Sequence, residues 1–380
     1  MSATESQAVP VYREQNFYVP TFKVKLRGRE LPDDVVYDVV QVSYKDNLEE
    51  VDSFEISINN WDAANRSFKY IDEDTFDPGK EIELYMGYHG KSPLSLMIKG
   101  EITSLRPNFP ATGQPTLAIT GLNLLHRLRK KQETCVYKDS TPSRIAGQIA
   151  DRLGLKICTN PTATAQEQPI PYLFQDNEYD ILFLWERARK IGYDLFVVEQ
   201  ATGQCQAGQL YFGPSTEVRR TTYQLSFNKS LVDFQPELAT HRQVGKVRVQ
   251  GWDAKKKEKI EYTATREDLK TSGLGTEGRQ EAVEQSFGDR EEVITDIPVN
   301  SVDDAKKLAI SALANIAKDL VTGRGTCIGL PDLRAGSVVM IDGMGQRFSG
   351  RYFVTATTHT INDSGYTTQF DCRREEIKGK

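Results

Sequence analysis

Two passages with the same layout decide the fold class of this chain. Residues 79–90 read GKEIELYMGYHG and residues 336–345 read GSVVMIDGMG. Each opens with a glycine, continues as a short strand with alternating apolar residues and ends in a glycine-containing turn. In both, an apolar residue then precedes another glycine, a second strand follows, and a third strand comes after a loop with Gly113 or Gly365. The copies run from Gly79 to Asn123 and from Gly336 to Arg373, and they predict two related β units.

The alternative is that antiparallel hairpins resemble one another in every β protein, because glycine turns and period-two strands recur. Other stretches support a β-rich chain, since residues 22–26 (FKVKL) and 54–58 (FEISI) also alternate. A chain with two related β units can present two similar surfaces to a partner. The repeat therefore favours an assembly component over an enzyme.

Composition restricts the class of protein. The chain has 380 residues, 38% of them hydrophobic and 27% charged, which is typical of about two or three folded domains. A net charge of −5 argues against a nucleic-acid partner. The apolar runs are too short to cross a bilayer and the N-terminus lacks a signal-peptide pattern, so we expect cytoplasmic synthesis without stable membrane insertion. The five cysteines are scattered, which favours reduced buried thiols over disulfides or zinc.

The hydrophobic period predicts the domain order of a mainly β (α+β) protein. Residues 1–19 form an N-terminal arm, residues 20–128 a first β-barrel domain, residues 129–222 an inserted small α/β domain, and residues 223–380 a second β-barrel domain. The last contains a charged hairpin or loop (253–290) and one long helix (302–321). Helices are expected after Thr141, after Asn177 as a capping residue with Gly192 at the end, and after Ser301.

The search for chemistry predicts no catalytic, cofactor-binding or metal-binding residues. Gly273–Gly278 matches GxGxxG as a string, but a polar run precedes it instead of a strand, so a loop is expected. The four histidines form no HExxH, and no Walker loop or nucleophile elbow is present. Two alternatives stay open: a cell-wall hydrolase, with Glu178 and Asp180 as candidate acids, and a carbohydrate-binding β module.

A set of strings resembles one known family. Residues 175–184 (QDNEYDILFL), Arg187-Ala188 and Gly192-Tyr193 are similar to a signature of the phage late-control protein D family. Residues 329–331, 333–337, 348–354, His359 and 365–368 are similar to its C-terminal barrel, and residues 247–253 resemble a recurring strand of the family, so that the resemblance covers roughly 175–375. Members are tail hubs, and similar segments form the N-terminal part of the spike proteins of type VI secretion systems.

The resemblance implies a structural hub in the baseplate of a contractile phage tail or a phage-derived injection system. It implies a homotrimer whose paired barrels make a pseudo-sixfold ring, adapting a hexameric tail tube to a trimeric spike. The partners would be the tube ring, a separate spike protein and other baseplate proteins, within an assembled particle that is virion-like, cytoplasmic or extracellular. Gln175 and Asp180 are expected to start a helix. The following residues are core or interface candidates, between which the sequence does not decide: Tyr352, Val354, His359, Tyr366 and Phe370.

Overall fold

The computed structural model describes residues 9–11, 19–90, 93–199, 201, 205–214, 222–241, 243–253, 256–271, 290–295, 299 and 301–374. It is mainly β and divides into two compact units. The first consists of Met1–Thr222, Thr326–Ser337 and Thr355–Phe370, and the second of Tyr223–Gly325, Val338–Val354 and Asp371–Lys380. Among the described residues, no helix is long and apolar enough to span a membrane.

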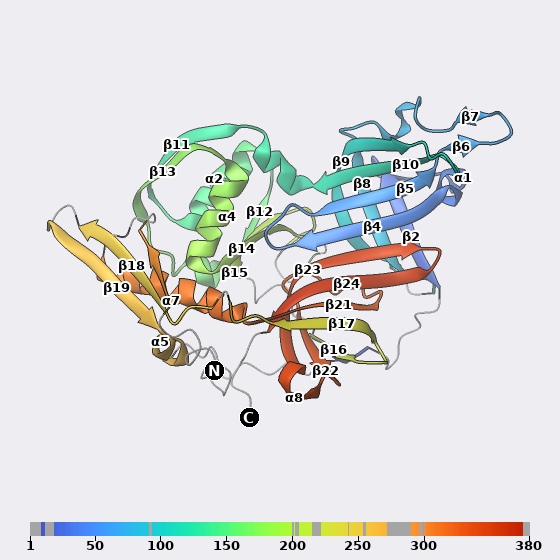
Figure 1. The fold of residues 1–380 in the computed structure, drawn as a ribbon. Coiled ribbons are helices and arrows are strands. Elements are labelled where there is room, and N and C mark those ends of the chain that lie inside the picture. The colour runs from blue at the N-terminus through green and yellow to red at the C-terminus, as the bar shows by residue number, and fades with distance from the viewer. Residues whose placement is uncertain are drawn as a thin grey trace. The chain divides into compact units, whose positions relative to one another are not determined.

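One antiparallel sheet organises the first unit (Figure 1). Its strand order is β3 (Arg29–Glu30), β2 (Pro20–Leu26), β8 (Glu81–Tyr88), β9 (Ser95–Asn108), β10 (Thr116–Asn123), β5 (Ser53–Asn59), β4 (Val39–Asn47) and β23 (Gly350–Asn362). Side chains alternate between core and surface, as in β5, where Phe54, Ile56 and Ile58 are buried. The Phe54 ring packs directly against Gly121 of β10. A Cβ at position 121 would lie 2.4 Å from the ring, so only glycine leaves room for it.

The predicted closed barrels are wrong. Among the described strands, none pairs β3 with β23, so the first sheet stays open. A barrel closes only when its two edge strands pair, and the two-residue strand β3 pairs only with β2 among the described strands. The repeated strands of the C-terminal part lie in a second order: β1 (Val9–Pro10), β16 (Thr222–Ser226), β22 (Val338–Asp342), β23, β24 (Gly365–Arg374), β21 (Val321–Ile328) and β17 (Leu231–Leu238). Within the described part of the chain, β17 does not pair with β1 or β16, so this order is open as well.

The two repeated passages fold alike. The first forms β8, β9 and β10, which pair in sequence order, and the second forms β22, β23 and β24, which do the same. Their opening glycines, Gly79 and Gly336, have φ of 87° and 86°. Their later loops contain Gly113 and Gly365, with φ of 99° and 118°. Only glycine adopts such left-handed backbone without strain, which explains why these positions match. β23 and β24 each pass from one unit into the other.

A small α/β region follows β10. It contains η2 (Leu124–Arg129), β11 (Gln132–Ser140), α2 (Pro142–Arg152), β12 (Ile157–Thr159), α3 (Pro161–Thr164), β13 (Ile170–Tyr179), α4 (Asp180–Ile191), β14 (Tyr193–Val197) and β15 (Leu210–Pro214). The Thr141 side chain accepts a hydrogen bond from Arg144 N and caps α2, as predicted. The prediction that Asn177 caps α4 is wrong, because Asn177 lies in β13 and Tyr179 is the N-cap. Gly192 ends α4 in the left-handed conformation, as predicted.

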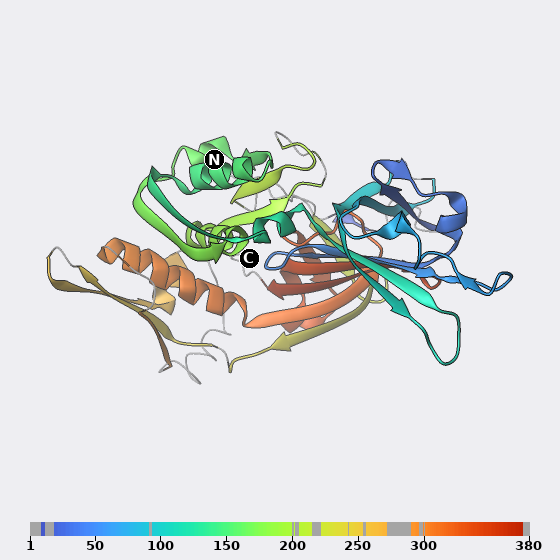
Figure 2. The same ribbon diagram turned by 90° about the horizontal axis from the view of Figure 1, so that it is seen from above.

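The second unit adds a helix on a hairpin. β18 (Lys246–Asp253) pairs with β19 (Glu258–Thr265) and β20 (Glu291–Ile294), and α5 (Arg266–Thr271) follows β19. Helix α7 (Val302–Lys318) lies along this sheet (Figure 2), where Ala305 and Ala309 are fully buried. Ser301 caps α7 as predicted. The GxGxxG string lies outside the described residues.

Candidate interaction surface

The five candidate interface residues are all buried. Tyr352 and Val354 belong to the second unit, whereas His359, Tyr366 and Phe370 belong to the first. The Tyr352 hydroxyl donates a hydrogen bond to Phe348 O at 2.7 Å, and its ring packs edge-on against Phe234. All five are core residues of this chain.

His359 is the centre of a buried polar network in the first unit. Its Nε2 lies 3.0 Å from Leu333 O, which can only accept, so Nε2 carries the hydrogen. Nδ1 then accepts from the hydroxyls of Tyr366 and Thr368, each at 3.1 Å. Burial, with the positive Arg334 nearby, lowers the pKa of His359 well below its usual range. The ring is therefore a buried structural group that links Leu333 to Tyr366 and Thr368.

Arg334 holds residues 329–337 in place through a second set of contacts. Its guanidinium donates to the backbone oxygens of Pro331, Met97 and Leu96 at 3.0–3.1 Å, and it lies 4.7 Å from the centre of the Tyr44 ring. The buried Asp46 carboxylate accepts from Ala335 N at 3.0 Å. Together with His359, these contacts fasten residues 329–337 to the first sheet.

The signature residues Gln175 and Asp180 form a second buried network. Gln175 accepts from the Tyr137 hydroxyl at 3.1 Å and donates to Asp180 Oδ1 at 2.9 Å. Arg152 of α2 donates to the same carboxylate oxygen at 2.6 Å. Asp180 begins α4, and its carboxylate also links α4 to α2 and β13. A structural role explains this pair.

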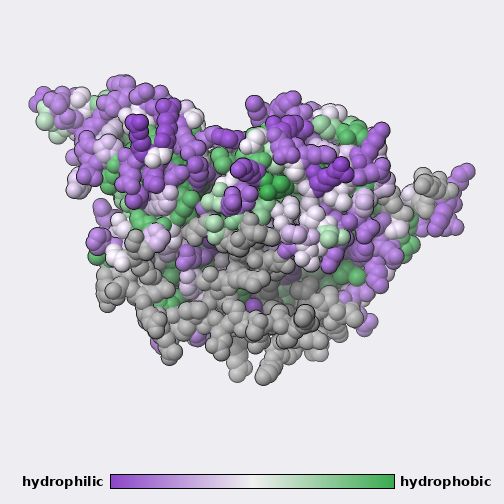
Figure 3. Space-filling model, turned by 180° about the vertical axis from the view of Figure 1, so that it is seen from behind, coloured by the Kyte–Doolittle hydropathy of each residue, from purple (hydrophilic) through white to green (hydrophobic). Residues whose placement is uncertain are grey.

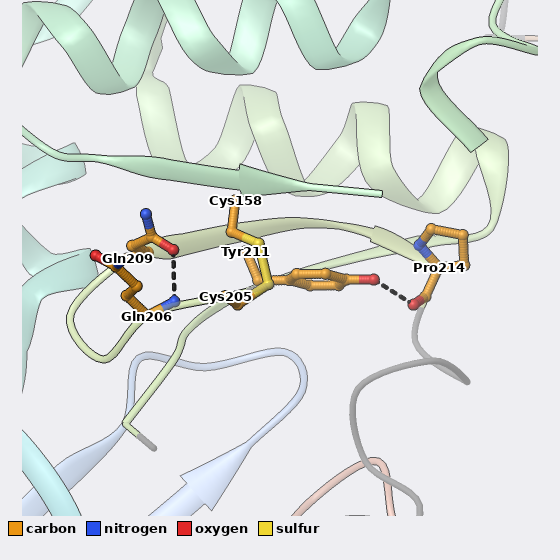
Figure 4. Close-up of a disulfide and its surroundings, with 6 residues drawn as sticks. All are labelled: Cys158, Cys205, Gln206, Gln209, Tyr211 and Pro214. Carbon is orange, nitrogen blue, oxygen red and sulfur yellow. Dashed lines mark hydrogen bonds between the residues drawn. A yellow bond between two sulfur atoms is a disulfide. The ribbon is translucent and has the colours of Figure 1, made fainter. Parts of the chain in front are cut away.

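The region contains a disulfide that the sequence analysis missed. Cys158 of β12 is bonded to Cys205, which precedes β15, and the two Cα atoms are 5.6 Å apart (Figure 4). The expectation that all five thiols are reduced is wrong for this pair; Cys135, Cys327 and Cys372 are free. No short cysteine motif signals the bond, because the partners are 47 residues apart in sequence and meet only through folding.

A polar groove of about 480 Å³ runs over the outer side of β4, β5, β9 and β10. Serine and threonine side chains dominate its lining. Glu55 is the one carboxylate among the lining residues, and Arg106 forms an ion pair with it. The pair of carboxylates that most glycoside hydrolases use is not found among these lining residues. Among the described residues, no cluster of three or more metal-ligating side chains exists.

Exposed aromatic rings gather at one end of the first sheet. Phe68 of β7 (Ser67–Phe68) lies between Trp61 of β6 (Trp61–Asp62) and Phe109, with ring centres 5.5 Å and 5.3 Å apart and both contacts edge-on. Tyr37, the last residue of α1 (Asp33–Tyr37), is 87% exposed nearby. We call these four residues the aromatic end. The signal was present in the sequence, as aromatic residues inside polar turn segments.

The hydrogen bonds under the aromatic end fix its position. Lys69 Nζ and the Tyr70 hydroxyl both donate to the Asp38 carboxylate, at 2.7 Å and 2.6 Å. Burial and the adjacent Asp38 charge raise the pKa of Tyr70. Asp38, the residue after α1, is thereby joined to Lys69 and Tyr70, which directly follow β7.

A second exposed apolar surface lies on the β11–β13 ribbon. Val136 pairs directly with Phe174, and Lys138 pairs with Tyr172, on the outer side of the two strands. Tyr172 is 61% exposed, while Tyr137 and Gln175 on the inner side are buried. We call Val136, Tyr172 and Phe174 the hairpin face. Seen from behind, the described surface is mostly hydrophilic with hydrophobic residues in scattered patches (Figure 3).

Solved structures resemble this fold over nearly its whole length. The 43 kDa tail protein of prophage MuSo2 from Shewanella oneidensis has a TM-score of 0.71 at 13% identity, covering 93% of this chain and 98% of that one. A tail protein from Neisseria meningitidis MC58 has a TM-score of 0.66 at 14% identity, covering 95% and 98%. The E. coli c3393 protein, described as a type VI secretion component similar to T4 tail proteins gp27 and gp5, has 0.57 at 11%, covering 94% and 78%.

At these identities the likeness establishes the fold, which is one found in phage tail proteins and in a type VI secretion component. No curated protein matches the sequence. The family model described as the Alg8 N-terminal domain matches residues 16–363, which is most of the chain. That match does not test the predicted resemblance to the late-control protein D family. The chain belongs to the Alg8 N-terminal domain family.

Proposed function

We propose that this protein is a structural hub in the baseplate of a contractile phage tail or a phage-derived injection system. The observation that carries the proposal is a tail-protein fold, matched over 93% of the chain, that contains the same three-stranded passage twice. In this proposal the protein is not an enzyme. Its strongly shifted ionisable groups, such as His359, are buried structural groups.

The mechanism is geometric. Three copies form a closed ring, and because each copy contributes two similar β units, the ring offers six nearly equivalent surfaces on one side. That side binds a hexameric tail tube, and the threefold symmetry of the other side receives a trimeric spike protein. The resemblance of residues 175–184 to the late-control protein D signature supports this assignment.

Light scattering on the purified chain tests the proposal. We expect a mass three times the chain mass of 42.8 kDa, and co-expression with tube and spike proteins of the same particle should yield a complex containing all three. A chain that stays monomeric and joins neither partner contradicts the hub. A twofold dimer also contradicts it, since two copies supply only four repeated surfaces.

A further inference from the structure

The two repeated passages belong to larger repeats of six strands each. In sequence order, the first repeat consists of β2, β4, β5, β8, β9 and β10, and the second of β16, β17, β21, β22, β23 and β24. In the sheet these strands lie in the orders β2-β8-β9-β10-β5-β4 and β16-β22-β23-β24-β21-β17. Each strand of one repeat therefore has a counterpart at the same place in the other. In particular, β17 is the counterpart of β4, and β9 is the counterpart of β23.

The chain contains one junction between the two repeats. β4, at the end of the first order, pairs antiparallel with β23, from Val42 opposite Ile361 to Asn47 opposite Ala356. β22 pairs with the preceding part of β23, up to Phe353. Because β24 follows β23 after a short turn and takes its other edge, β22 and β4 share one edge of β23. Half of one edge of the central strand thus receives the last strand of the neighbouring repeat.

The corresponding half-edge of β9 is free. β8 pairs with β9 as far as Glu101, and the backbone of Ile102 bonds to the residues just before β8. β10 takes the opposite edge of β9. In the part of the chain that the structure describes, no strand pairs with Thr103–Asn108 on the β8 edge. This free segment has six residues, as does the segment Ala356–Ile361 of β23 that receives β4.

The counterpart of β4 is also free on one side. Among the described strands, β17 pairs with β21 alone, and Val232 and Leu238 of β17 are 62% and 37% exposed. A strand with one open edge is a site to which another strand can be added. Each chain therefore has one strand without a second neighbour and one half-edge without a strand. The counterparts of these two are paired with each other inside the same chain.

We propose that β17 of one copy lies antiparallel against Thr103–Asn108 of β9 in the next copy, so that three such contacts repeat the β4–β23 junction and close the ring. This inference rests on the proposed trimer and assigns its contact. The partner is a second copy of this chain, because the chain itself shows which strand occupies this position in a repeat. A head-to-tail contact between two different edges closes a ring of identical subunits when the rotation fits.

The free edges differ from the paired ones in their prolines. Pro107 lies in β9 and Pro236 in β17, whereas the paired segments Val42–Asn47 and Ala356–Ile361 contain no proline. Proline cannot donate a backbone hydrogen bond, and it hinders unspecific strand addition to an exposed edge. The contact between copies should therefore have fewer backbone hydrogen bonds than the β4–β23 junction. Exposed side chains such as Val232 then contribute more of its affinity.

Two variants that each block one edge test this contact. The first carries Val232→Asp and Leu238→Asp in β17, and the second carries Thr103→Asp and Asn108→Asp in β9. A carboxylate buried in the contact without a partner is costly, so each variant alone should lose the trimer and show the monomer mass by light scattering. Mixed in equal amounts, the two should form a dimer and nothing larger, because only one intact contact remains and it cannot close a ring.

A charge-reversed combination tests whether the two edges touch. A chain with Val232→Asp and Leu238→Asp that also carries Thr103→Lys and Asn108→Lys has opposite charges on the two edges, so the trimer should return. The matched control is Trp252→Asp, which places the same charge at an apolar position of β18 that is also 62% exposed and lies outside both edges. This control should stay trimeric.

Folding is checked separately. Circular dichroism should give the same spectrum for all variants. If the variant with Val232→Asp and Leu238→Asp does not fold, Gln235→Asp tests the same strand, because it adds one charge at an exposed position without removing an apolar side chain. It should shift the trimer towards monomer.

The outcomes separate this inference from the proposed function. If the unmodified chain is a trimer and the variants of both edges remain trimers, the contact assignment is wrong and the hub proposal stands. If both variants are folded monomers whose mixture gives no dimer, and the charge-reversed chain stays monomeric, the pairing of β17 with β9 is wrong. If the unmodified chain does not form a trimer, the hub proposal and this inference fail together.

Discussion

His359 should make the stability of the first unit depend on pH. In the folded chain its pKa lies well below the usual 6.5, through burial and the positive Arg334, whereas in the unfolded chain it returns to about that value. Below this pH the unfolded state binds a proton that the folded state excludes. The free energy of unfolding should therefore have its full value above pH 6.5. As the pH falls below 6.5, it should decrease by up to about 1.4 kcal/mol per pH unit.

Urea denaturation at pH 7.5, 6.5 and 5.5 measures this dependence. The His359→Gln variant is the matched control, since glutamine fits a similar space and does not titrate. Its midpoint should change less over this range than that of the unmodified chain. Equal slopes for the two proteins would show that His359 does not cause the loss of stability.

Arg334 should be sensitive even to a conservative replacement. Its guanidinium serves three backbone oxygens at once and lies over Tyr44, which a single lysine ammonium cannot reproduce. Arg334→Lys should lower the free energy of unfolding by about 2 kcal/mol, because it leaves at least one buried carbonyl unpaired. Arg324→Lys is the control: that side chain is 72% exposed in its pair with Asp371, so its loss should stay below about 1 kcal/mol. Similar losses at both positions in urea melts would contradict the fastening role.

At the scale of elements, the disulfide between β12 and the segment before β15 can be tested by counting free thiols. The oxidised, denatured chain should titrate three thiols, and the reduced chain five. Because the bond closes a segment of 47 residues, Cys158→Ser should lower the stability of the oxidised protein by about 4 kcal/mol. The same change should have little effect under reducing conditions. Five thiols in the oxidised protein would exclude the bond.

Local signals predicted most individual elements. The alternation of apolar residues predicted β5 and β8, and the capping residues Thr141 and Ser301 predicted the starts of two helices. Both kinds of signal depend only on residues that are close in sequence. The cap of α4 was misplaced because Asn177, although a good capping residue, adopts a positive φ within β13. Asn177 lies at the register shift of the β11–β13 ladder, between the pairs Glu133–Glu178 and Cys135–Gln175, and its backbone N–H donates to the Thr134 hydroxyl.

Pairings between distant segments were not predictable in the same way. An alternating pattern predicts that a strand has one buried face, but it does not predict which strand pairs with it. Thus the repeat was found, but the pairing of β23 with β4 and the open sheet were not. The candidate surface was missed for the same reason: Trp61, Phe68 and Phe109 form one cluster only after two separate turns meet.

At the scale of the whole molecule, the first unit is discontinuous in sequence. It takes Thr326–Ser337 and Thr355–Phe370 from the C-terminal part of the chain. In the second of these segments, Ala356 pairs with Asn47 and Ile361 with Val42, so β23 completes the edge beside β4. Ile361 and Tyr366 also lie in the core cluster of this unit.

A truncated chain of residues 19–222 should therefore fail to fold cooperatively, although it includes both the main sheet strands and the α/β region. Without β23 the ladder of β4 is left open, and exposed edges of this kind promote aggregation. The hydrogen bond from the Tyr88 hydroxyl to Gly329 O, 2.9 Å long, is also lost. A chain ending at Arg374 is the control, because it keeps every described strand. In urea, the control should unfold in one or more sharp transitions, whereas the fragment should show a single broad transition. The fragment should also bind a hydrophobic dye in the absence of urea. A sharp transition for the fragment would mean that the N-terminal segment folds as an independent domain and that the C-terminal strands are not needed for its folding.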